Sequence, residues 1–456
     1  MYRSNVVDRV AAKHLCSACG VCVGECPARA LSMGKSALGD PVPVQTAACL
    51  PKCHVCLDCC PFAGGEHNPR PKNQILFHPE NGSPSVFDSN IGWHIRSLAG
   101  HVKAGEIRAR AASGGLVTWC LRRLLLTGAV DRVGVLEMHS DCRGAPLFRF
   151  KSTDSPAEIV AAAGTVYYPV SLSDLANEIL AGPPKRWALV GVPCLCAAVR
   201  NSPRLRKRVP YLLGLACGMY QNEMYTEVLL SASGVHRAEV STLHYRVKPD
   251  RPPASNFQFV ASDDINGRGR PIPYHGLPLF LGNNAYFRLN SCNFCRDVFA
   301  ETADACFMDA WLPSFSLDTK GNSLVVTRDA RIDELLKSGI ASHELELQDA
   351  GPEQVVASQA SHVRRKRELI HLRLGQAEVP TGCRKPTMHE RLVWWLQQHT
   401  QDRSKKAWAT WGRSRGLIPF WLSMLDLVVA QLALKGFMRY TDRALRAWQL
   451  LQRKIF

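Results

Sequence analysis

The sequence predicts a multidomain protein of the mixed α+β or α/β class, built from three parts. A cysteine-rich head occupies residues 1–75, a central α/β domain residues 76–345 and a basic helical extension residues 346–456. Nine of the 18 cysteines fall between Cys16 and Cys60. Apolar strand-like runs alternate with helical runs in the middle, and Lys and Arg are enriched near the end. A chain of 456 residues has ample core for this division.

The amino-terminal stretch MYRSNVVDRVAAKHLC has neither the apolar segment nor the small-residue cleavage site of a secretory signal. We therefore expect a cytoplasmic protein. In a reducing compartment, clustered cysteines are more often metal ligands or redox groups than disulfides.

The first cysteine run, CSACGVCVGECP, contains Cys16, Cys19, Cys22 and Cys26. Its C-x2-C-x2-C-x3-C-P spacing is that of bacterial ferredoxins, which hold 4Fe–4S clusters. Three thiolates on one tight loop can each reach one iron of a cubane, and small residues between them let the backbone wrap it. In two-cluster ferredoxins the fourth cysteine ligates the other cluster. A second run is therefore expected.

The second run is ACLPKCHVCLDCCPF, residues 48–62. Counted back from Cys60, it reads C-x3-C-x2-C-x3-C-P, one residue longer than standard in its first gap. This interpretation gives two ligand sets and leaves Cys59 spare. The sets are Cys16, Cys19, Cys22 and Cys60 for one cluster, and Cys49, Cys53, Cys56 and Cys26 for the other. An alternative register uses Cys53, Cys56 and Cys59 and leaves Cys49 spare.

Together the two runs predict a ferredoxin-like domain with two [4Fe-4S] clusters. A pair of zinc knuckles is the alternative, because C-x2-C pairs also bind zinc. Two triplets, each completed by a Cys-Pro pair, disfavour zinc.

In the middle of the chain, residues 186–193, 211–218 and 322–329 predict buried strands, and residues 114–128 and 173–182 predict helices. Ser113, Gly114 and Gly115 stand at the start of the first helix, where free amides and the helix dipole can bind a phosphate. Gly191 and Pro193 predict a rigid turn at the carboxyl end of a strand, where α/β proteins bind ligands.

Six motifs in this order carry a resemblance to a known family: AASGGLVTWCLRRLLLTGAVDRV, AAGTVYYPVSLSDLANEI, ALVGVPCLCAAVR, LLGLACG, CNFCRDVFAETADACFMDAW and GNSLVVTRD. Over residues 10–335 the chain resembles the beta subunits of coenzyme F420-dependent hydrogenases and dehydrogenases, a family that includes hydroxymethyl-chlorophyll reductase. The resemblance implies a flavoprotein that holds FAD in its middle domain, receives electrons from iron–sulfur clusters and reduces a substrate at the flavin.

Carried onto this chain, the resemblance implies two groups of flavin-binding residues. Ser113, Gly114, Gly115 and Thr118 would line the flavin or its phosphates, and Gly191, Pro193 and Cys194 would lie beside its ring. The chain departs from the family at Cys196, where a glutamine is common, and at Ala310, which interrupts a Gly-Asp-x-Trp ending. The first departure puts the hydrogen bonding to the flavin in doubt.

Cys292 and Cys295 form a further C-x2-C pair. With Cys217 and Cys194 brought near by the fold, they would hold a third 4Fe–4S cluster. A zinc half-site, a redox dithiol and plain buried cysteines stay open as alternatives.

Substrate reduction needs protons as well as electrons. Asp297 and Asp309 are the candidate catalytic residues, and Asp304, His244 and Tyr245 are further possible donors. A surface or helix-capping carboxylate is the structural alternative for each aspartate.

The net charge of +17 predicts an acidic partner. Residues 417–434 nearly reach the length of a membrane span, but Pro419 and Asp426 count against spanning. Flanking Lys, Arg and Trp residues favour an interfacial helix on an anionic membrane surface, and a helical pair packed on the central domain is the alternative.

The sequence therefore predicts a cytoplasmic oxidoreductase, peripheral to the inner membrane face if the tail binds lipid. It would pass electrons from a ferredoxin-like donor through the clusters to FAD and on to a small organic substrate or an F420-like cofactor. The first alternative is an electron-transfer or scaffold subunit of a larger complex without its own flavin. A zinc-dependent nucleic-acid binder is the least favoured.

Overall fold

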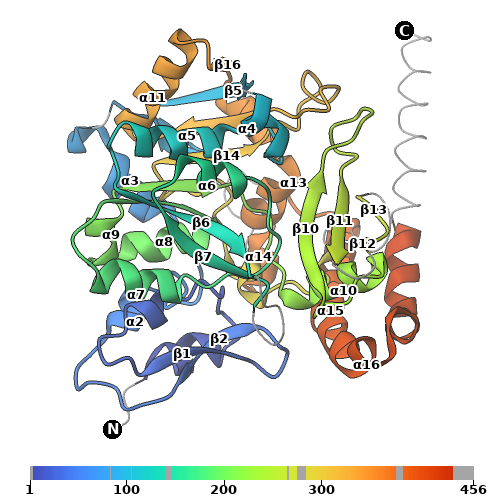
Figure 1. The fold of residues 1–456 in the computed structure, drawn as a ribbon. Coiled ribbons are helices and arrows are strands. Elements are labelled where there is room, and N and C mark those ends of the chain that lie inside the picture. Colours follow the sequence, from blue (N-terminus) through green and yellow to red (C-terminus); the bar gives the residue numbers. More distant parts are fainter. Residues whose placement is uncertain are drawn as a thin grey trace.

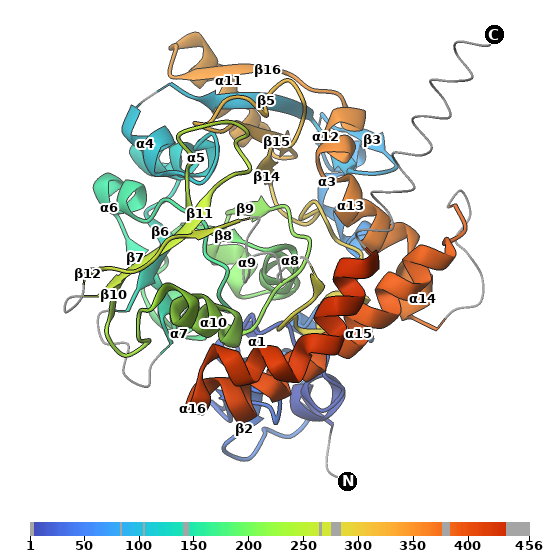
Figure 2. The same cartoon turned by 90° about the vertical axis from the view of Figure 1, so that its right-hand side faces the viewer.

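The computed structural model describes residues 4–82, 84–103, 105–139, 146–263, 267–274, 284–375 and 384–434 (Figures 1 and 2). Its centre is an eight-stranded mixed sheet in the order β16-β5-β15-β14-β9-β8-β6-β7. The strands are β5 (Arg96–Val102), β6 (Arg132–Met138), β7 (Phe148–Thr153), β8 (Trp187–Gly191), β9 (Tyr211–Leu215), β14 (Ala305–Asp309), β15 (Ser323–Thr327) and β16 (Leu345–Asp349). The predicted strands therefore exist as β8, β9 and β15.

Five strands of this sheet point the same way. β6, β8, β9 and β14 pair in parallel, and β5 shares their direction because β15 is antiparallel to both β14 and β5. The loops that follow these five strands therefore leave from one edge, which we call the carboxyl edge. Ligands of α/β proteins bind at such an edge.

Helices cover both faces of the sheet. Along neighbouring strands, Ala188, Leu213 and Phe307 point into one core with α5 (Leu116–Leu126) and α11 (Ala330–Ala341). Residues one place away along each strand point into the opposite core, with α1 (Val21–Gly24), α7 (Ser173–Ala181) and α8 (Pro193–Asn201). Side chains that alternate between two apolar cores are expected of a strand buried on both faces. α5 and α7 are the two predicted helices.

The remaining elements before residue 350 are short. They are η1 (Val7–Ala11), α2 (Val55–Cys59), α3 (Arg70–Phe77), η2 (Pro79–Asn81), β3 (Val86–Asp88), β4 (Gly92–His94), α4 (Gly105–Arg110), α6 (Pro156–Ala161), α9 (Leu205–Arg208) and η4 (Asn290–Phe294).

The head packs directly on the central domain. Its hairpin pairs β1 (Leu31–Lys35) with β2 (Pro41–Gln45), and α1 lies against α7. The Leu172 amide donates to the Cys19 carbonyl over 2.9 Å. A Cβ on Gly24 would lie 2.5 Å from the Ala176 Cβ, so this interface needs a glycine. The head and the body therefore share one continuous core.

A second, smaller sheet lies beside the first and binds the tail. It contains β10 (Val240–Val247), β11 (Gln258–Asp263), β12 (Gly267–Arg268) and β13 (Ile272–Pro273), next to α10 (Glu223–Ser233). The tail is helical, as predicted. Its elements are α12 (Pro352–Ser358), α13 (Ala360–Val363), η5 (Arg364–Glu368), α14 (Ile370–Arg373), α15 (Met388–Ala407), η6 (Trp408–Gly412), α16 (Arg413–Arg415) and a helix over Leu417–Leu434. Figure 2 shows these helices crossing the face of the molecule from α12 to α16.

One buried ion pair fastens the tail to the head. Lys405 on α15 has no exposed surface, and its Nζ lies 2.7 Å from Asp40 Oδ2. The amide of Asn222 donates to the other Asp40 oxygen over 3.0 Å. Burial raises the pKa of Asp40, so this carboxylate depends on Lys405 to stay charged.

Replacing Lys405 by methionine is expected to lower the free energy of unfolding by about 3 kcal/mol, because it leaves a buried carboxylate unpaired. Urea unfolding of the purified protein measures this change. Lys406→Met, at an exposed neighbouring position, is the control, and Lys405→Met combined with Asp40→Asn should recover much of the loss. Equal urea-unfolding midpoints for Lys405→Met and Lys406→Met would contradict the stabilising role of the Lys405–Asp40 ion pair.

Candidate redox site

The first set of head cysteines surrounds a cavity under the Cys16–Cys22 loop. This loop turns at Gly20, whose φ is +72°, and a Cβ there would lie 1.9 Å from Ser171 Oγ. The cavity is lined by Cys16, Cys19, Cys22, Cys59 and Cys60. Burial raises the pKa of the Cys60 thiol to about 12, and Cys19 adds to the rise. A cluster bound here would offset that cost of burial by binding the thiolates.

The second set gathers around Cys56. Burial raises the pKa of its thiol, and three further thiols contribute: Cys53, Cys26 and Cys49. Cys59 lines the first cavity beside Cys60, and its thiol is also affected by Cys56 of the second set. Both registers of the second run therefore stay open. Cluster ligation itself stays a prediction.

The surroundings of the head cysteines fit cubane clusters. The Ala18 and Ala30 amides donate to Cys16 Sγ and Cys26 Sγ over 3.4 and 3.3 Å. Amide–sulfur bonds of this kind tune cluster potentials. Among the residues that the structure describes, no three His, Cys, Asp or Glu side chains lie close enough to hold a single metal ion. In a cubane each thiolate binds a different iron, so its ligands can be more widely spaced.

A third set of cysteines converges at the carboxyl edge. Burial raises the pKa of the Cys194 thiol well above its ordinary value, and four neighbouring thiols add to the rise. These neighbours are Cys19, Cys295, Cys217 and Cys292. Cys194 is the second residue of α8, just after β8, and Cys217 follows the adjacent strand β9. Adjacent parallel strands thus bring two of the four thiols together.

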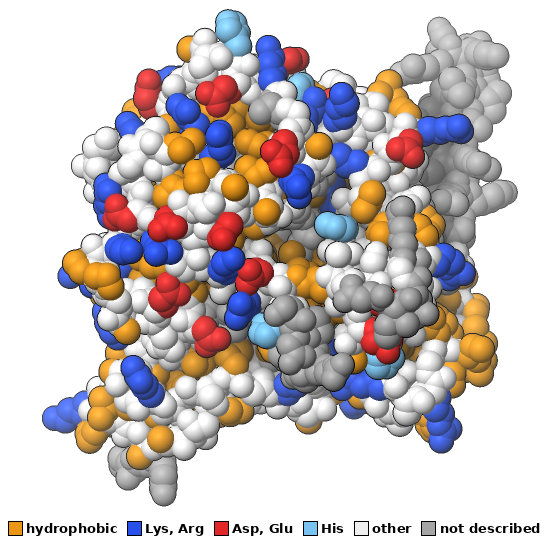
Figure 3. Space-filling view, viewed as in Figure 1, with side chains coloured by type: hydrophobic (Ala, Val, Ile, Leu, Met, Phe, Trp, Pro, Cys, Tyr) orange, Lys and Arg blue, Asp and Glu red, His pale blue; other side chains and the backbone are white. Residues whose placement is uncertain are grey.

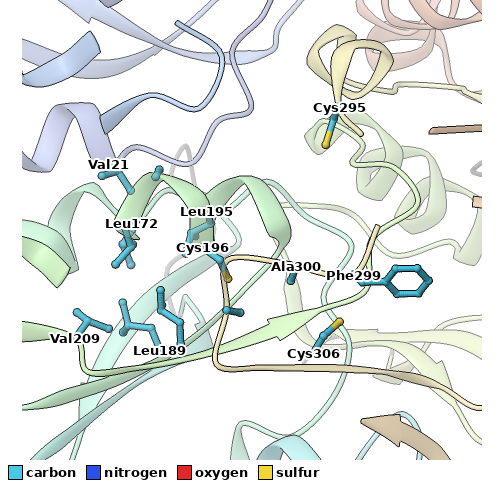
Figure 4. Close-up of a cluster of buried hydrophobic side chains, with 14 of the residues drawn as sticks. Val21, Leu172, Leu189, Leu195, Cys196, Val209, Cys295, Phe299, Ala300 and Cys306 are labelled. Atoms are coloured by element: carbon cyan, nitrogen blue, oxygen red, sulfur yellow. The ribbon is translucent and has the colours of Figure 1, made fainter. Parts of the chain in front are cut away.

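The other two thiols of this set belong to η4 and the residue after it. The Tyr220 amide donates to Cys292 Sγ over 3.2 Å, and Cys295 forms an isolated bridge with His67. Figure 4 shows Cys295 on its loop, apart from Cys196 and Cys306 in the apolar core. Because the Cys19 thiol of the head contributes to the raised pKa of Cys194 together with the other three thiols, this third set lies next to the head.

Positive side chains from the tail surround the third set. Lys366 is buried, and its Nζ donates to the Cys217 carbonyl over 3.2 Å and to the Asp297 carbonyl. Burial by itself would lower the pKa of Lys366, but the Cys295, Cys217 and Cys292 thiols outweigh it and raise the pKa. Arg365 donates to the Gly218 carbonyl.

Two further guanidinium groups lie within the same electrostatic environment. Burial lowers the pKa of Arg373, and Arg365 and Arg288 lower it further. Buried N–H groups of Arg288, Arg365 and Arg373 lack a hydrogen-bond partner among the described residues. Clustered buried cations with unpaired donors fit an anionic group beside them, and a thiolate-bound cluster carries such charge.

The Ser-Gly-Gly loop lies at the same edge, after β5. The Gly114 amide donates to Ser323 Oγ over 3.0 Å, and a Cβ on Gly114 would lie 2.6 Å from the Gly100 carbonyl oxygen. Lys248 Nζ donates to the Ser113 carbonyl over 3.0 Å and to two further carbonyls nearby. Gly115 has a φ of +85° and starts α5, where Thr118 is buried. The loop is therefore held in a fixed shape.

The structure places the second group of predicted flavin residues farther along this edge. Gly191 ends β8, Pro193 opens α8, and the Cys196 thiol donates to the Gly191 carbonyl over 3.4 Å. β5 and β8 are four strand spacings apart, which is about 19 Å. A small ligand could not contact both the Ser-Gly-Gly loop and the Gly191–Pro193 turn. An extended dinucleotide is long enough to reach from one to the other.

Asp309 lies between these two places, at the end of β14. It pairs in register with Ser323, and its Oδ2 accepts from Arg246 Nη1 over 2.8 Å. The Arg246 guanidinium lies 4.4 Å from the Phe257 ring centroid and 5.5 Å from that of Trp311. This arrangement puts a carboxylate and a cation on the carboxyl edge.

Asp297 is in a different place, beside the third cysteine set. It is fully buried, and its Oδ2 lies 3.6 Å from His67 Nε2. Burial raises its pKa, but nearby His67, Lys366 and Arg367 outweigh this, so the pKa lies below its ordinary value. Asp297 is thus held ionised, which suits a proton acceptor rather than a donor.

The other proposed donors are less well placed. Asp304 precedes β14 at the opposite edge, where burial raises its pKa to about 6 despite Arg200. Tyr245 is buried and bonds the Thr226 hydroxyl over 2.5 Å. His244 is exposed on β10.

Sequence reasoning missed Arg246, Lys248 and the tail cations. Arg246 and Lys248 follow no motif, and only the folding of β10 over the carboxyl edge brings them there. Arg365 and Lys366 were visible only as part of a basic helix.

Two family models match the chain, and both describe the coenzyme F420 hydrogenase/dehydrogenase beta subunit. Residues 97–177 match the model for its N-terminal part, and residues 184–353 match the model for its C-terminal part. The chain belongs to this family. The resemblance read from the six motifs is confirmed.

Other comparisons add little to this assignment. A search of curated proteins gave no match. Among solved structures, a chain of the F420-reducing [NiFe] hydrogenase complex from Methanosarcina barkeri is 18% identical, with a TM-score of 0.48. That similarity covers 66% of this chain and 99% of the other.

As a member of the F420 hydrogenase/dehydrogenase beta-subunit family, the chain has a role in iron–sulfur oxidoreductase chemistry. The two matched regions contain the Ser-Gly-Gly loop, Asp309 and all four cysteines of the third set. The head cysteines and the cations of η5 and α14 lie outside them.

Proposed function

We propose that this chain is an iron–sulfur flavoprotein oxidoreductase that takes electrons from a ferredoxin-like donor at the head. They would travel through three [4Fe-4S] clusters to FAD at the carboxyl edge and on to a small organic substrate or an F420-like cofactor. The flavin would supply the change from one-electron to two-electron chemistry. The observation that supports this proposal is the gathering of four cysteines at the carboxyl edge, where Cys194 follows β8, Cys217 follows β9, and the thiols of Cys19 and of the rest of the third set raise the pKa of Cys194.

Each group has residues of this chain to hold it. The two head clusters would be held by the sets that contain Cys16 and Cys56, and the third by Cys194, Cys217, Cys292 and Cys295. The Ser-Gly-Gly loop would bind the dinucleotide phosphates through amides other than that of Gly114, which already donates to Ser323 Oγ, and Gly191 and Pro193 would shape the other end of the site. Arg246 would position the Asp309 carboxylate near the reacting end through their 2.8 Å contact.

A spectrum of anaerobically purified protein, with iron, sulfide and flavin quantification, tests the proposal. We expect about 12 iron atoms and as many sulfides per chain, from three four-iron clusters, together with one FAD. Iron and sulfide without flavin would favour the electron-transfer subunit instead. Zinc without acid-labile sulfide would overturn both.

A further inference from the structure

The helix over Leu417–Leu434 has two apolar faces on opposite sides. On the inner side, Phe420, Met424 and Leu427 are buried in a core shared with α10, the small sheet and α15. These residues follow one another at intervals of four and three, which places them on one face. The inner face thus attaches the helix to the body.

The outer face of this helix is apolar but exposed. It is formed by Ile418, Leu422, Leu425, Val429 and Leu432, each more than half exposed. Their four- and three-residue spacing makes one continuous stripe. In Figure 3, hydrophobic side chains gather at the lower right edge of the molecule, where Figure 1 shows this helix. Large apolar stripes of this kind mark interaction surfaces.

The helix is long and apolar enough to cross a membrane, and it alone among the described residues meets that test. The burial of its inner face argues against a membrane-spanning helix, because Phe420 and Met424 would have to leave the protein core. Only the outer stripe is available to lipid. Such a helix can lie in the plane of a membrane surface with one face inserted.

The charges beside the stripe fit an anionic surface. Lys406 and Arg415 are exposed at its end, and the Arg415 guanidinium lies 4.9 Å from the Trp411 ring centroid. Arg413 is paired with Glu227 over 2.8 Å and so adds little to this charge. From Arg403 to residue 434, Asp426 is the one acidic residue, and Arg403 neutralises it over 2.7 Å. The sequence beyond the described residues continues with Lys435, Arg439 and Arg443. Trp with Lys or Arg is typical of membrane interfaces.

A second copy of the chain is a poorer occupant. Helices that pair through such a stripe carry complementary charges along its flanks, which select the partner. Here Asp426 is the single charged residue of the helix. We propose that the Leu417–Leu434 helix docks the protein on an anionic lipid surface, with its outer stripe inserted between the headgroups.

Flotation of the full-length protein with liposomes tests the docking. The probes are vesicles of phosphatidylcholine alone and vesicles with phosphatidylserine added. We expect the protein to float with the anionic vesicles and to bind at least about tenfold less when Leu422 and Val429 are both replaced by glutamate. Both positions are exposed, so folding should be retained. Leu317→Glu, at an exposed site on the central domain, is the control.

Two results would overturn the proposal. One is flotation that is the same for the wild type and the double variant, or absent for both. The other is a wild type that light scattering shows to be a dimer, a double variant that is a monomer, and no lipid binding by either protein. The stripe would then bind a second copy of the chain.

Discussion

Replacing Cys292 by serine is expected to remove about four iron atoms per chain and to stop substrate reduction by electrons delivered at the head. The physical reason is the loss of one of four thiolates that converge at the carboxyl edge, where the Tyr220 amide donates to the Cys292 sulfur. Iron and sulfide quantification measures the first effect. Stopped-flow reduction by dithionite-reduced ferredoxin, followed at the flavin absorbance, measures the second.

The head clusters should survive this change, because their ligands lie in a separate part of the chain. Cys120→Ser is the control, since Cys120 lies on α5 and is buried in the apolar core that contains none of the other cysteine sets. Unchanged iron content in the Cys292 variant would show that the third set binds no cluster. Loss of all iron would instead mean that the variant misfolds, which circular dichroism distinguishes.

Replacing Lys366 by methionine is expected to lower the midpoint potential of the proposed third cluster by about 60 to 120 mV. A buried ammonium beside a cluster stabilises its more negative, reduced form. At the effective dielectric of a protein one charge is worth about 1.4 to 3 kcal/mol at such range. For a one-electron couple about 1.4 kcal/mol corresponds to about 60 mV. Redox titration followed by electron paramagnetic resonance gives the potential directly.

Lys366→Arg keeps the charge and should leave the potential close to that of the wild type. Lys207→Met, at an exposed site on α9, is the control for a general change in net charge. A potential that moves equally in all three variants, or in none, would contradict the compensating role of Lys366.

Much of this architecture was readable from local sequence. The spacing from Cys16 to Cys60 predicted two thiol sets, and the structure groups Cys49 with Cys53, Cys56 and Cys26. The predicted strands and helices of the central domain are present. Long apolar runs that are bounded by Gly or Pro leave few alternative secondary structures. The boundaries between the three parts remain predictions.

The neighbours of the third cysteine set could not be predicted from local sequence. The resemblance placed Cys194 beside the flavin ring, and Cys194 was also grouped with Cys217, Cys292 and Cys295 as a third-cluster candidate, but its closeness to Cys19 depends on how the head packs against α8. Lys366 lies about 150 residues beyond Cys217 in the sequence, so only tertiary folding reveals their contact. No local pattern encodes a pairing of this kind.

The hydrogen bond from the Leu172 amide to the Cys19 carbonyl has a kinetic consequence. Many redox enzymes carry their iron–sulfur module on a tether that swings between donor and acceptor. Here the head is hydrogen-bonded to the body at Cys19, which would ligate its cluster. The ion pair between Lys405 and Asp40 attaches the head to the tail as well. Electrons would cross a static junction, and the rate of that crossing would not depend on the viscosity of the solvent.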